Sequence, residues 1–101
     1  MTGLDPLIHQ PIRMRILAAL YRNRQSSFTN LRDGLGLTAG NLASHAAKLQ
    51  GAGYVESGRA LVGINFEVRF RITPKGSEAF RHYVEALQRL ATDLGRHIES
   101  P

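Results

Sequence analysis

The stretch that decides the fold of this chain is Leu37–Glu56, which reads LTAGNLASHAAKLQGAGYVE. Thr38 is a residue type that caps helix N-termini, and Gly51 and Gly53 are typical of helix C-termini. The stretch therefore predicts a helix over residues 39–50, followed by a change of structure.

The two faces of this helix differ in chemistry. At ~100° per residue, Leu42, Ala46 and Leu49 gather on one side and predict a core contact. Such a core face leaves an outward face that is small and polar: Gly40, Asn41, Ser44, Ala47 and Lys48. This outward face suits the major groove of DNA, because small residues permit close approach while Asn, Ser and Lys hydrogen-bond to base edges and phosphates.

The start and the edge of the same helix add candidate contacts. Thr38 and Ala39 are neutral, so the positive end of the helix is open to a phosphate. His45 lies beside Asn41 and Lys48 at the boundary between the two faces. Two interpretations fit His45: it reads a base, or it packs between helices with one ring nitrogen hydrogen-bonded.

An initial turn and two helical patterns come before this helix. Asp5-Pro6 predicts a short initial turn, and residues 11–23 predict an amphipathic helix with its arginines outside. Ser26-Ser27 predicts the cap of a further helix that stops at Gly36. The arginines of this region either contact phosphates or are simply solvated: Arg13, Arg15, Arg22, Arg24 and Arg32.

After Gly53 the apolar period changes from that of a helix to that of a strand. Residues 54–56 predict a short strand, and the alternation of residues 66–72, FEVRFRI, predicts a half-buried one. Gly58 and Gly63 lie between them, so we expect a two-stranded hairpin with a loop longer than the tight two-residue type.

The last predicted helix runs from Thr73-Pro74 to about Ile98. A helix of ~24 residues spans about 36 Å, which is more than a domain of this size needs. We therefore expect its apolar stripe to pack against the same helix of a second copy; the alternative is plain intrachain core. The stripe follows a 4-3-4-3-4 spacing, broadened by Tyr83 and Leu90, with Leu4, Leu7 and Ile8 as additional cover: Phe80, Val84, Leu87, Ala91, Leu94 and Ile98.

Composition limits the classes of function. The chain has 101 residues and a mass of 11.2 kDa, which predicts a single domain over residues 1–101. The net charge of +5 comes from residues 1–72 and favours a polyanionic partner there. The absence of Cys excludes disulfides and thiolate metal sites. No apolar run approaches the ~20 residues of a membrane span, so we expect a cytoplasmic protein with no membrane partner.

The sequence favours neither catalysis nor a cofactor. It contains no GxSxG, GxxxxGK[ST] or HExxH motif, so we expect that the protein is not an enzyme. His82 and His97 are too far apart on the last helix to share a metal ion within one chain, which leaves only a site across a dimer. We expect no metal and no cofactor, and the sequence assigns no small-molecule effector.

Taken in order, these segments resemble the winged helix-turn-helix regulators of the MarR and ArsR type, particularly their compact single-domain members. The resemblance covers roughly residues 5–90. It implies a mainly α fold with a small β-hairpin (α+β), in which residues 5–72 form the helix-turn-helix and wing and residues 73–99 form a dimerisation helix. The motifs that carry it are Leu37-Thr38, Leu42, Ser44-His45, Lys48-Leu49, Gly53-Tyr54-Val55 and Thr73-Pro74-Lys75-Gly76.

The resemblance also implies site residues. Asn41, Ser44, His45 and Lys48 match DNA-facing positions of the recognition helix, and residues 59–69 match the wing. The sequence departs from the family at the wing tip, LVGINF, which is apolar where relatives carry Arg or Lys; Arg59 and Arg69 lie only at its base. This departure disfavours insertion of the tip into a minor groove and favours its packing on protein.

We therefore predict a homodimeric transcriptional regulator, most simply a repressor, that binds double-stranded DNA in a sequence-specific manner. Two alternatives are a protein–protein adaptor that docks a partner through the apolar wing and tail, and an architectural duplex binder without sequence preference. The predicted DNA contacts are Thr38, Ala39, Gly40, Asn41, Ser44, His45, Lys48, Arg59 and Arg69. The predicted dimer contacts are Phe80, Tyr83, Val84, Leu87, Leu90, Ala91, Leu94 and Ile98.

Overall fold

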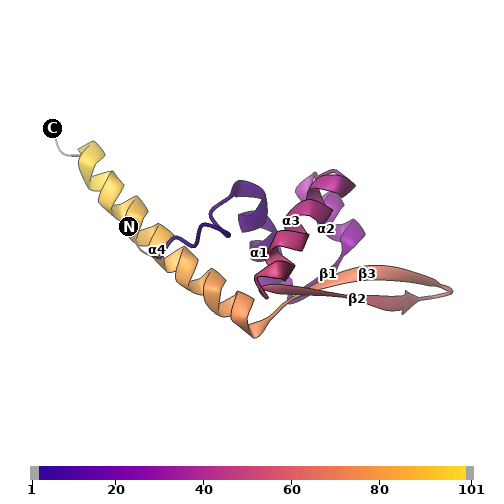
Figure 1. The fold of residues 1–101 in the computed structure, drawn as a ribbon. Helices are drawn as coiled ribbons and strands as arrows, with labels where there is room; N and C mark the ends of the chain where they lie inside the picture. The colour runs from indigo at the N-terminus through magenta and orange to yellow at the C-terminus, as the bar shows by residue number, and fades with distance from the viewer. Residues whose placement is uncertain (1–2, 100–101) are drawn as a thin grey trace.

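The computed structural model describes residues 3–99 and places a small helical body between two projections. The long helix α4 extends from one end of the body, and the hairpin of β2 and β3 extends from the other (Figure 1). The molecule is therefore elongated, with extents of 63 × 25 × 20 Å. Its elements are α1 (Pro11–Asn23), β1 (Gln25–Ser27), α2 (Phe28–Leu35), α3 (Ala39–Gly51), β2 (Val55–Val62), β3 (Asn65–Ile72) and α4 (Pro74–Glu99).

The helices begin where their caps predict. The side-chain oxygens of Ser27, Thr38 and Thr73 each accept a hydrogen bond from the backbone N–H three residues further on, at 3.0, 3.1 and 2.9 Å. Each bond satisfies one of the N–H groups that a helix start leaves without a partner. Gly36 ends α2 in the left-handed conformation, at φ +66°.

The predicted hairpin is present, but its loop is shorter than expected. β2 continues to Val62 and β3 begins at Asn65, so only Gly63-Ile64 connects them. Gly63 supplies the positive φ, +62°, that a two-residue type II′ turn requires at its first position. The prediction of a longer loop is wrong, because Gly58 does not end the first strand of the hairpin. Gly58 lies within β2 and is paired with Arg69 of β3.

A third strand, which the sequence did not predict, completes the sheet. Residues 25–27 form β1 and pair antiparallel with residues 69–71 of β3, so the strand order is β1-β3-β2. Three polar residues are too few to show the alternation of apolar and polar side chains that predicts a strand. Residues 25–27 form a strand because they pair with β3, and this pairing cannot be seen in the local sequence.

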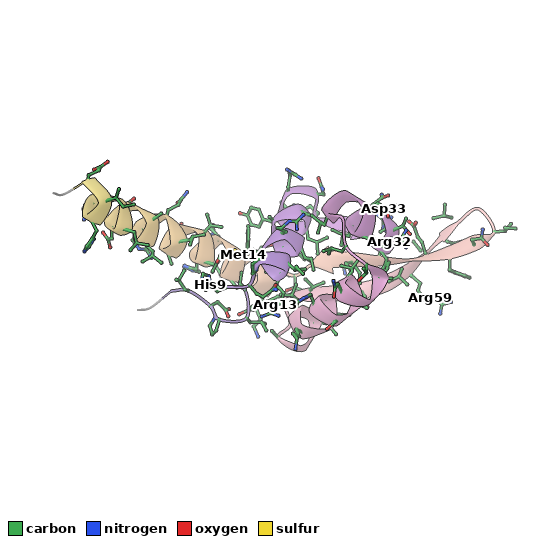
Figure 2. All side chains as sticks on the ribbon, turned by 90° about the horizontal axis from the view of Figure 1, so that it is seen from above. His9, Arg13, Met14, Arg32, Asp33 and Arg59 are labelled. Atoms are coloured by element: carbon green, nitrogen blue, oxygen red, sulfur yellow. The ribbon has the colours of Figure 1, made fainter. Side chains whose placement is uncertain are left out.

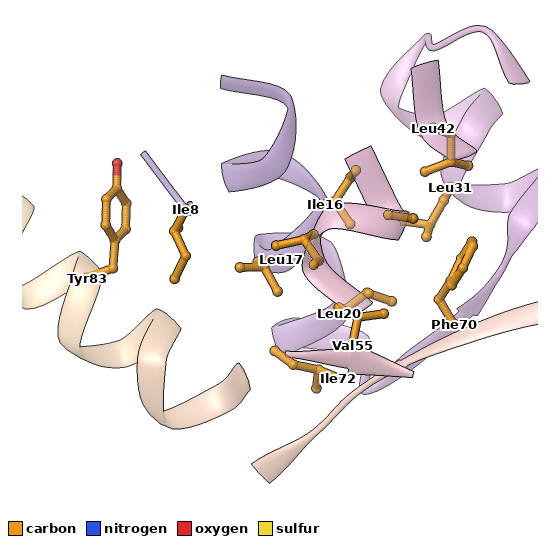
Figure 3. Close-up of a cluster of buried hydrophobic side chains, with 12 residues drawn as sticks. Ile8, Ile16, Leu17, Leu20, Leu31, Leu42, Val55, Phe70, Ile72 and Tyr83 are labelled. Atoms are coloured by element: carbon orange, nitrogen blue, oxygen red, sulfur yellow. The ribbon is translucent and has the colours of Figure 1, made fainter. Parts of the chain in front are cut away.

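The core lies where the helices meet the base of the sheet (Figure 3). Each buried aliphatic or aromatic side chain contributes roughly 1.5–3 kcal/mol by leaving water. The residues that α1, α2, α3 and the strands bring together are Ile16, Leu17, Leu20, Leu31, Leu42, Leu49, Val55, Phe70 and Ile72.

The N-terminal arm, residues 3–10, contains the predicted initial turn. The backbone N–H of Leu7 donates to Asp5 Oδ1 at 2.9 Å. The prediction that Ile8 adds cover to a dimer contact is wrong, because Ile8 is fully buried inside the chain. Leu4 and Leu7 are partly buried against the same core, and their place at a dimer contact stays a prediction.

The helix α4 divides into a proximal half, residues 74–87, and a distal half, residues 88–99. In the proximal half Tyr83 is 1% exposed, and its hydroxyl lies 2.8 Å from His9 Nδ1. In the distal half Leu94 and Ile98 are 54% and 85% exposed. Tyr83, expected at a dimer contact, therefore belongs to the intrachain core, whereas Phe80, Val84 and Leu87 of the stripe are only partly buried against that core.

Candidate nucleic-acid interface

The helix α3 presents the outward face that its sequence predicts. Leu42, Ala46 and Leu49 are buried, at 0–1% exposure, and fix the orientation of the helix. The opposite face is open to solvent and carries small or polar side chains with no carboxylate. Its exposed residues include Thr38, Ala39, Gly40, Asn41, Ser44, Ala47 and Lys48.

Side-chain hydrogen bonds hold α3 on both flanks. Arg13 Nη1 of α1 lies 3.2 Å from Nδ1 of His45, which belongs to α3. The guanidinium of Arg13, labelled in Figure 2, also donates through Nε to the carbonyl of Leu7 in the N-terminal arm. On the other flank Gln50 Nε2 donates to Ser57 Oγ of β2 at 2.8 Å. The outward face of α3 is therefore held in a fixed relation to α1 and to the hairpin.

His45 is half-buried beside Arg13 of α1, which agrees with the packing interpretation and leaves its contact with a base a prediction. Burial is the largest cause that lowers the pKa of His45 below its ordinary value, and the positive charges of Arg13 and Lys48 lower it further. Because a guanidinium only donates, Nδ1 accepts and the ring proton resides on Nε2. The neutral ring keeps one N–H donor for a second partner.

Two arginines of α1 have a structural role that sequence analysis missed. Arg15 Nη2 donates to the carbonyl of Leu35, at the C-terminal end of α2, at 2.9 Å. Arg13 makes the contacts to His45 and Leu7. Both were expected on a solvated or phosphate-facing surface. A charge pattern along one helix does not show which carbonyls another helix brings within reach.

The arginines at the base of the hairpin are engaged by neighbouring side chains. The Arg59 guanidinium lies 5.1 Å from the centre of the Phe66 ring, in a cation–π contact. Arg69 Nη1 pairs with Glu67 Oε1 at 2.6 Å, and its Nε donates to Gln25 Oε1 at 3.2 Å. The pair with Glu67 compensates part of the positive charge that Arg69 was expected to offer to phosphate.

One face of β3 is apolar along its whole length, and this face is buried at the base of the hairpin and exposed toward its tip. Phe70 and Ile72 of β3 are buried, whereas Val68 and Phe66 on the same face are 43% and 63% exposed. Leu61 pairs with Phe66 across the ribbon and is also 63% exposed. The apolar tip that the sequence predicts is therefore an uncovered surface.

Within residues 3–99 no three His, Asp or Glu side chains gather where a metal ion could be held. His82 Nε2 instead lies 2.8 Å from Glu78 Oε1, in an exposed pair one helical turn apart. Over the same residues, no helix has both the length and the apolar character needed to cross a membrane.

A family model described as a winged helix DNA-binding domain matches residues 12–91. The chain belongs to this family. Within this winged-helix domain the β2–β3 hairpin has the position of the wing, and α3 is the helix for which the sequence predicts the contacts with DNA. The mainly α fold, the small sheet and the long C-terminal helix agree with the predicted fold class.

The chain is also similar to other proteins in sequence and in structure. A protein of Methanocaldococcus jannaschii, MJ0432, is 32% identical over 88 residues, which is 87% of this chain and 96% of that protein. A transcriptional regulator homologue from Pyrococcus horikoshii superposes with a TM-score of 0.82 at 26% identity, covering 87% of each chain. A PadR family transcriptional regulator from Eggerthella lenta shares the fold, with a TM-score of 0.72 at 17% identity over 90% of this chain and 88% of its own.

Proposed function

We propose that this winged-helix protein is a homodimeric transcriptional regulator that binds double-stranded DNA at specific sites and represses by occluding its operator. The observation that carries the proposal is the outward face of α3, which is exposed, small and without carboxylates, on a helix that is hydrogen-bonded to α1 on one flank and to β2 on the other. Membership of a DNA-binding family and the likeness to the Pyrococcus horikoshii regulator homologue support it.

The roles of the contacts follow from their chemistry. In this proposal Asn41 and Ser44 hydrogen-bond with base edges, because their side chains carry donors and acceptors, and the point charge of Lys48 contacts a phosphate. Thr38, Ala39 and Gly40 form the uncrowded, positive end of α3 and approach the DNA backbone. Arg59 and Arg69 of the wing contact flanking phosphates.

The decisive experiment is a titration of duplex DNA at increasing salt. A dimer with ~6–10 phosphate contacts loses about 10³–10⁵ in affinity between 50 and 200 mM salt, because bound counterions are released. A specific regulator also prefers its own site over random duplex, whereas an architectural binder does not. Affinity that is flat in salt contradicts the proposal.

Single substitutions test the recognition helix. Lys48→Ala weakens binding to all duplexes alike, and Ser44→Ala weakens binding mainly to the specific site. Arg96→Ala is the matched control, because it also removes one exposed positive charge but lies at the far end of α4. Thermal unfolding of all three variants separates a lost contact from a lost fold.

The second candidate function is a protein–protein adaptor. The exposed apolar wing favours it, since Ile64 is 94% exposed and Phe66 and Leu61 are each 63% exposed. An adaptor of this kind does not bind duplex DNA in a salt-dependent manner. The titration therefore decides between the two functions.

A further inference from the structure

The side chain of Arg13 in α1 is held by its own surroundings at the point where it reaches α3. Its Nε donates to the carbonyl of Leu7 in the N-terminal arm, and its backbone N–H donates to Gln10 Oε1 at 2.8 Å. Its Nη1 lies 3.2 Å from His45 Nδ1. Because a guanidinium is planar and carries its donors in a fixed fork, the bond at Nε also directs Nη1. Arg13 therefore offers His45 a donor at a defined place.

The bond to Arg13 leaves one polar atom of the His45 ring free. Nδ1 accepts from Arg13, so the proton of the neutral ring resides on Nε2. Within residues 3–99 this is the hydrogen bond that the ring makes, and in that part of the chain no buried side-chain nitrogen or oxygen lacks a partner. Nε2 of this half-buried residue is therefore open to solvent, as an N–H donor.

This donor lies among the side chains that we propose to contact DNA. Asn41 precedes His45 by four positions and Lys48 follows it by three, so the three residues share one face of α3. Asn41 and Lys48 are exposed, and so is Ser44 beside them. When α3 enters a major groove through this face, the Nε2–H group of His45 comes close to the base edges.

A single N–H donor selects bases by the acceptors at their major-groove edge. Guanine offers two acceptors, N7 and O6, and no donor. Adenine places an amino donor beside N7, thymine places a methyl group beside its acceptor, and cytosine offers an amino donor. The positive charges of Arg13 and Lys48 lie close enough to His45 to lower its pKa, and they also favour the two acceptors of guanine. The opposite tautomer of the ring would accept at Nε2 and suit the amino groups instead.

We propose that Arg13 is a positioning residue that holds His45 in the Nε2–H form, so that His45 donates to N7 of a guanine in the major groove. The inference rests on the DNA binding of the proposed function and names one base that the protein reads. Arg13 does not touch this base and acts through His45. Loss of the Arg13 donor therefore weakens the preference for guanine at one position of the site.

The tautomer of His45 can be measured without DNA. Nitrogen NMR distinguishes a ring nitrogen that carries a proton from one that does not, and the signals of His45 are assigned by their loss in His45→Ala. In the parent we expect the proton on Nε2 at neutral pH. Arg13→Met keeps the length of the side chain but removes its donors, so it raises the share of the form with the proton on Nδ1. A parent ring protonated on Nδ1, or an unchanged tautomer in Arg13→Met, overturns the proposal.

The guanine is identified with modified DNA. The probe is a duplex that the parent selects from a random library, in which each guanine is replaced in turn by 7-deazaguanine; this base keeps its pairing but has a carbon in place of N7. At the guanine that His45 contacts, replacement in one half-site weakens binding by the parent about 2–10-fold, the range of a single hydrogen bond. His45→Ala binds the two duplexes equally, and Arg13→Met loses most of the difference.

The ratio of these two affinities separates positioning from other roles of Arg13. If Arg13 contacted a phosphate or only stabilised the fold, Arg13→Met would lower both affinities alike and leave the ratio unchanged, which contradicts the proposal. Arg22→Met is the matched control, because it removes the same charged group from an exposed position of α1 and keeps the ratio of the parent. In the His45→Ala background, Arg13→Met changes the ratio no further, since the two residues act as one unit.

The outcomes separate this base contact from the proposed function. Salt-dependent binding in which His45→Ala keeps the sensitivity to every 7-deazaguanine overturns the base contact and leaves the proposed regulator intact. A His45→Ala variant that weakens all duplexes alike indicates a phosphate contact and also overturns the base contact. A parent that binds no duplex overturns the proposed function and this inference together. The tautomer of the parent and the comparison with His45→Ala need no Arg13 variant, so they decide the base contact even where Arg13→Met fails to fold.

Discussion

The two halves of α4 carry one continuous apolar stripe but have different surroundings. The proximal half is anchored in its own domain through Tyr83, which is 1% exposed, whereas Leu94 and Ile98 of the distal half are 54% and 85% exposed. The amphipathic period is the same in both halves. The amphipathic period thus indicates that one face of a helix is buried. Whether the helix's own chain buries that face depends on how far the helix extends beyond its domain.

The largest expected effect comes from removing the anchor of the proximal half. Tyr83→Ala lowers the free energy of unfolding by about 3–5 kcal/mol, because it empties a fully buried aromatic site. It also removes the hydrogen bonds to His9 Nδ1 and Met14 Sδ, residues labelled in Figure 2. The matched Leu94→Ala changes unfolding of the dissociated chain by no more than about 0.5 kcal/mol. Urea denaturation of dilute protein measures both, and equal losses would remove the distinction between the halves.

The next largest effect is expected on the association of two copies into the proposed homodimer. Leu94→Glu with Ile98→Glu places charges where the two copies meet, and the dimer dissociation constant rises by at least about 100-fold, or ~2.7 kcal/mol. Sedimentation across a concentration series measures the change. The control is Asp93→Gln with Arg96→Gln, which alters two exposed residues beside the stripe. An unchanged dimer in the Glu variant contradicts a role for the distal half.

A smaller loss of stability is expected at Gly76, where the proximal half of α4 contacts the backbone of Tyr54. A Cβ on Gly76 would lie 2.0 Å from the backbone carbonyl oxygen of Tyr54, so α4 cannot pack as it does with a larger residue at this position. We expect Gly76→Ala to lower the free energy of unfolding by about 1–3 kcal/mol, as overpacking does. Thermal unfolding tests this, and a variant as stable as the parent would mean that the helix can move away from β2 without cost.

A Gly→Ala substitution in the distal half has the opposite effect on the free energy of unfolding, and its effect is the smallest of the four. A Cβ on Gly95 meets open space. Gly95→Ala therefore raises the free energy of unfolding by roughly 1 kcal/mol, because Ala favours the helix and Gly does not. The measurement uses the dissociated Leu94→Glu, Ile98→Glu background, so that dimer contacts do not contribute. A loss of stability there would show that the distal half packs against its own chain.

Local signals predicted most of the fold. The hydroxyls of Ser27, Thr38 and Thr73 cap their helices because the groups they bond lie three residues away, within the same stretch of sequence. The outward face of α3 was predictable for a similar reason, since one helix wheel separates its buried residues from its exposed ones. The contact of these exposed residues with DNA stays a prediction.

Features that depend on distant residues were not predictable. The strand β1 exists because residues 69–71 pair with it, and Arg13 reaches His45 across 32 positions of sequence. Tyr83 was placed at a dimer contact because the wheel shows that it is apolar and on the stripe. The wheel does not show that the N-terminal arm occupies that side of α4, where a Cβ on Gly3 would lie 2.8 Å from Ala86 Cβ.

The bond between His9 and Tyr83 joins residues 74 positions apart in the sequence. During synthesis the arm emerges before its partners on α4. The β2–β3 hairpin, by contrast, joins neighbouring segments and forms on a timescale of about 1–10 μs. We therefore expect the arm to dock last in folding, after the rest of the core has closed. We also expect the amides of the arm to be among the first of the ordered body to exchange their hydrogens with solvent, because a segment that docks last opens at a lower free energy than the rest of the core.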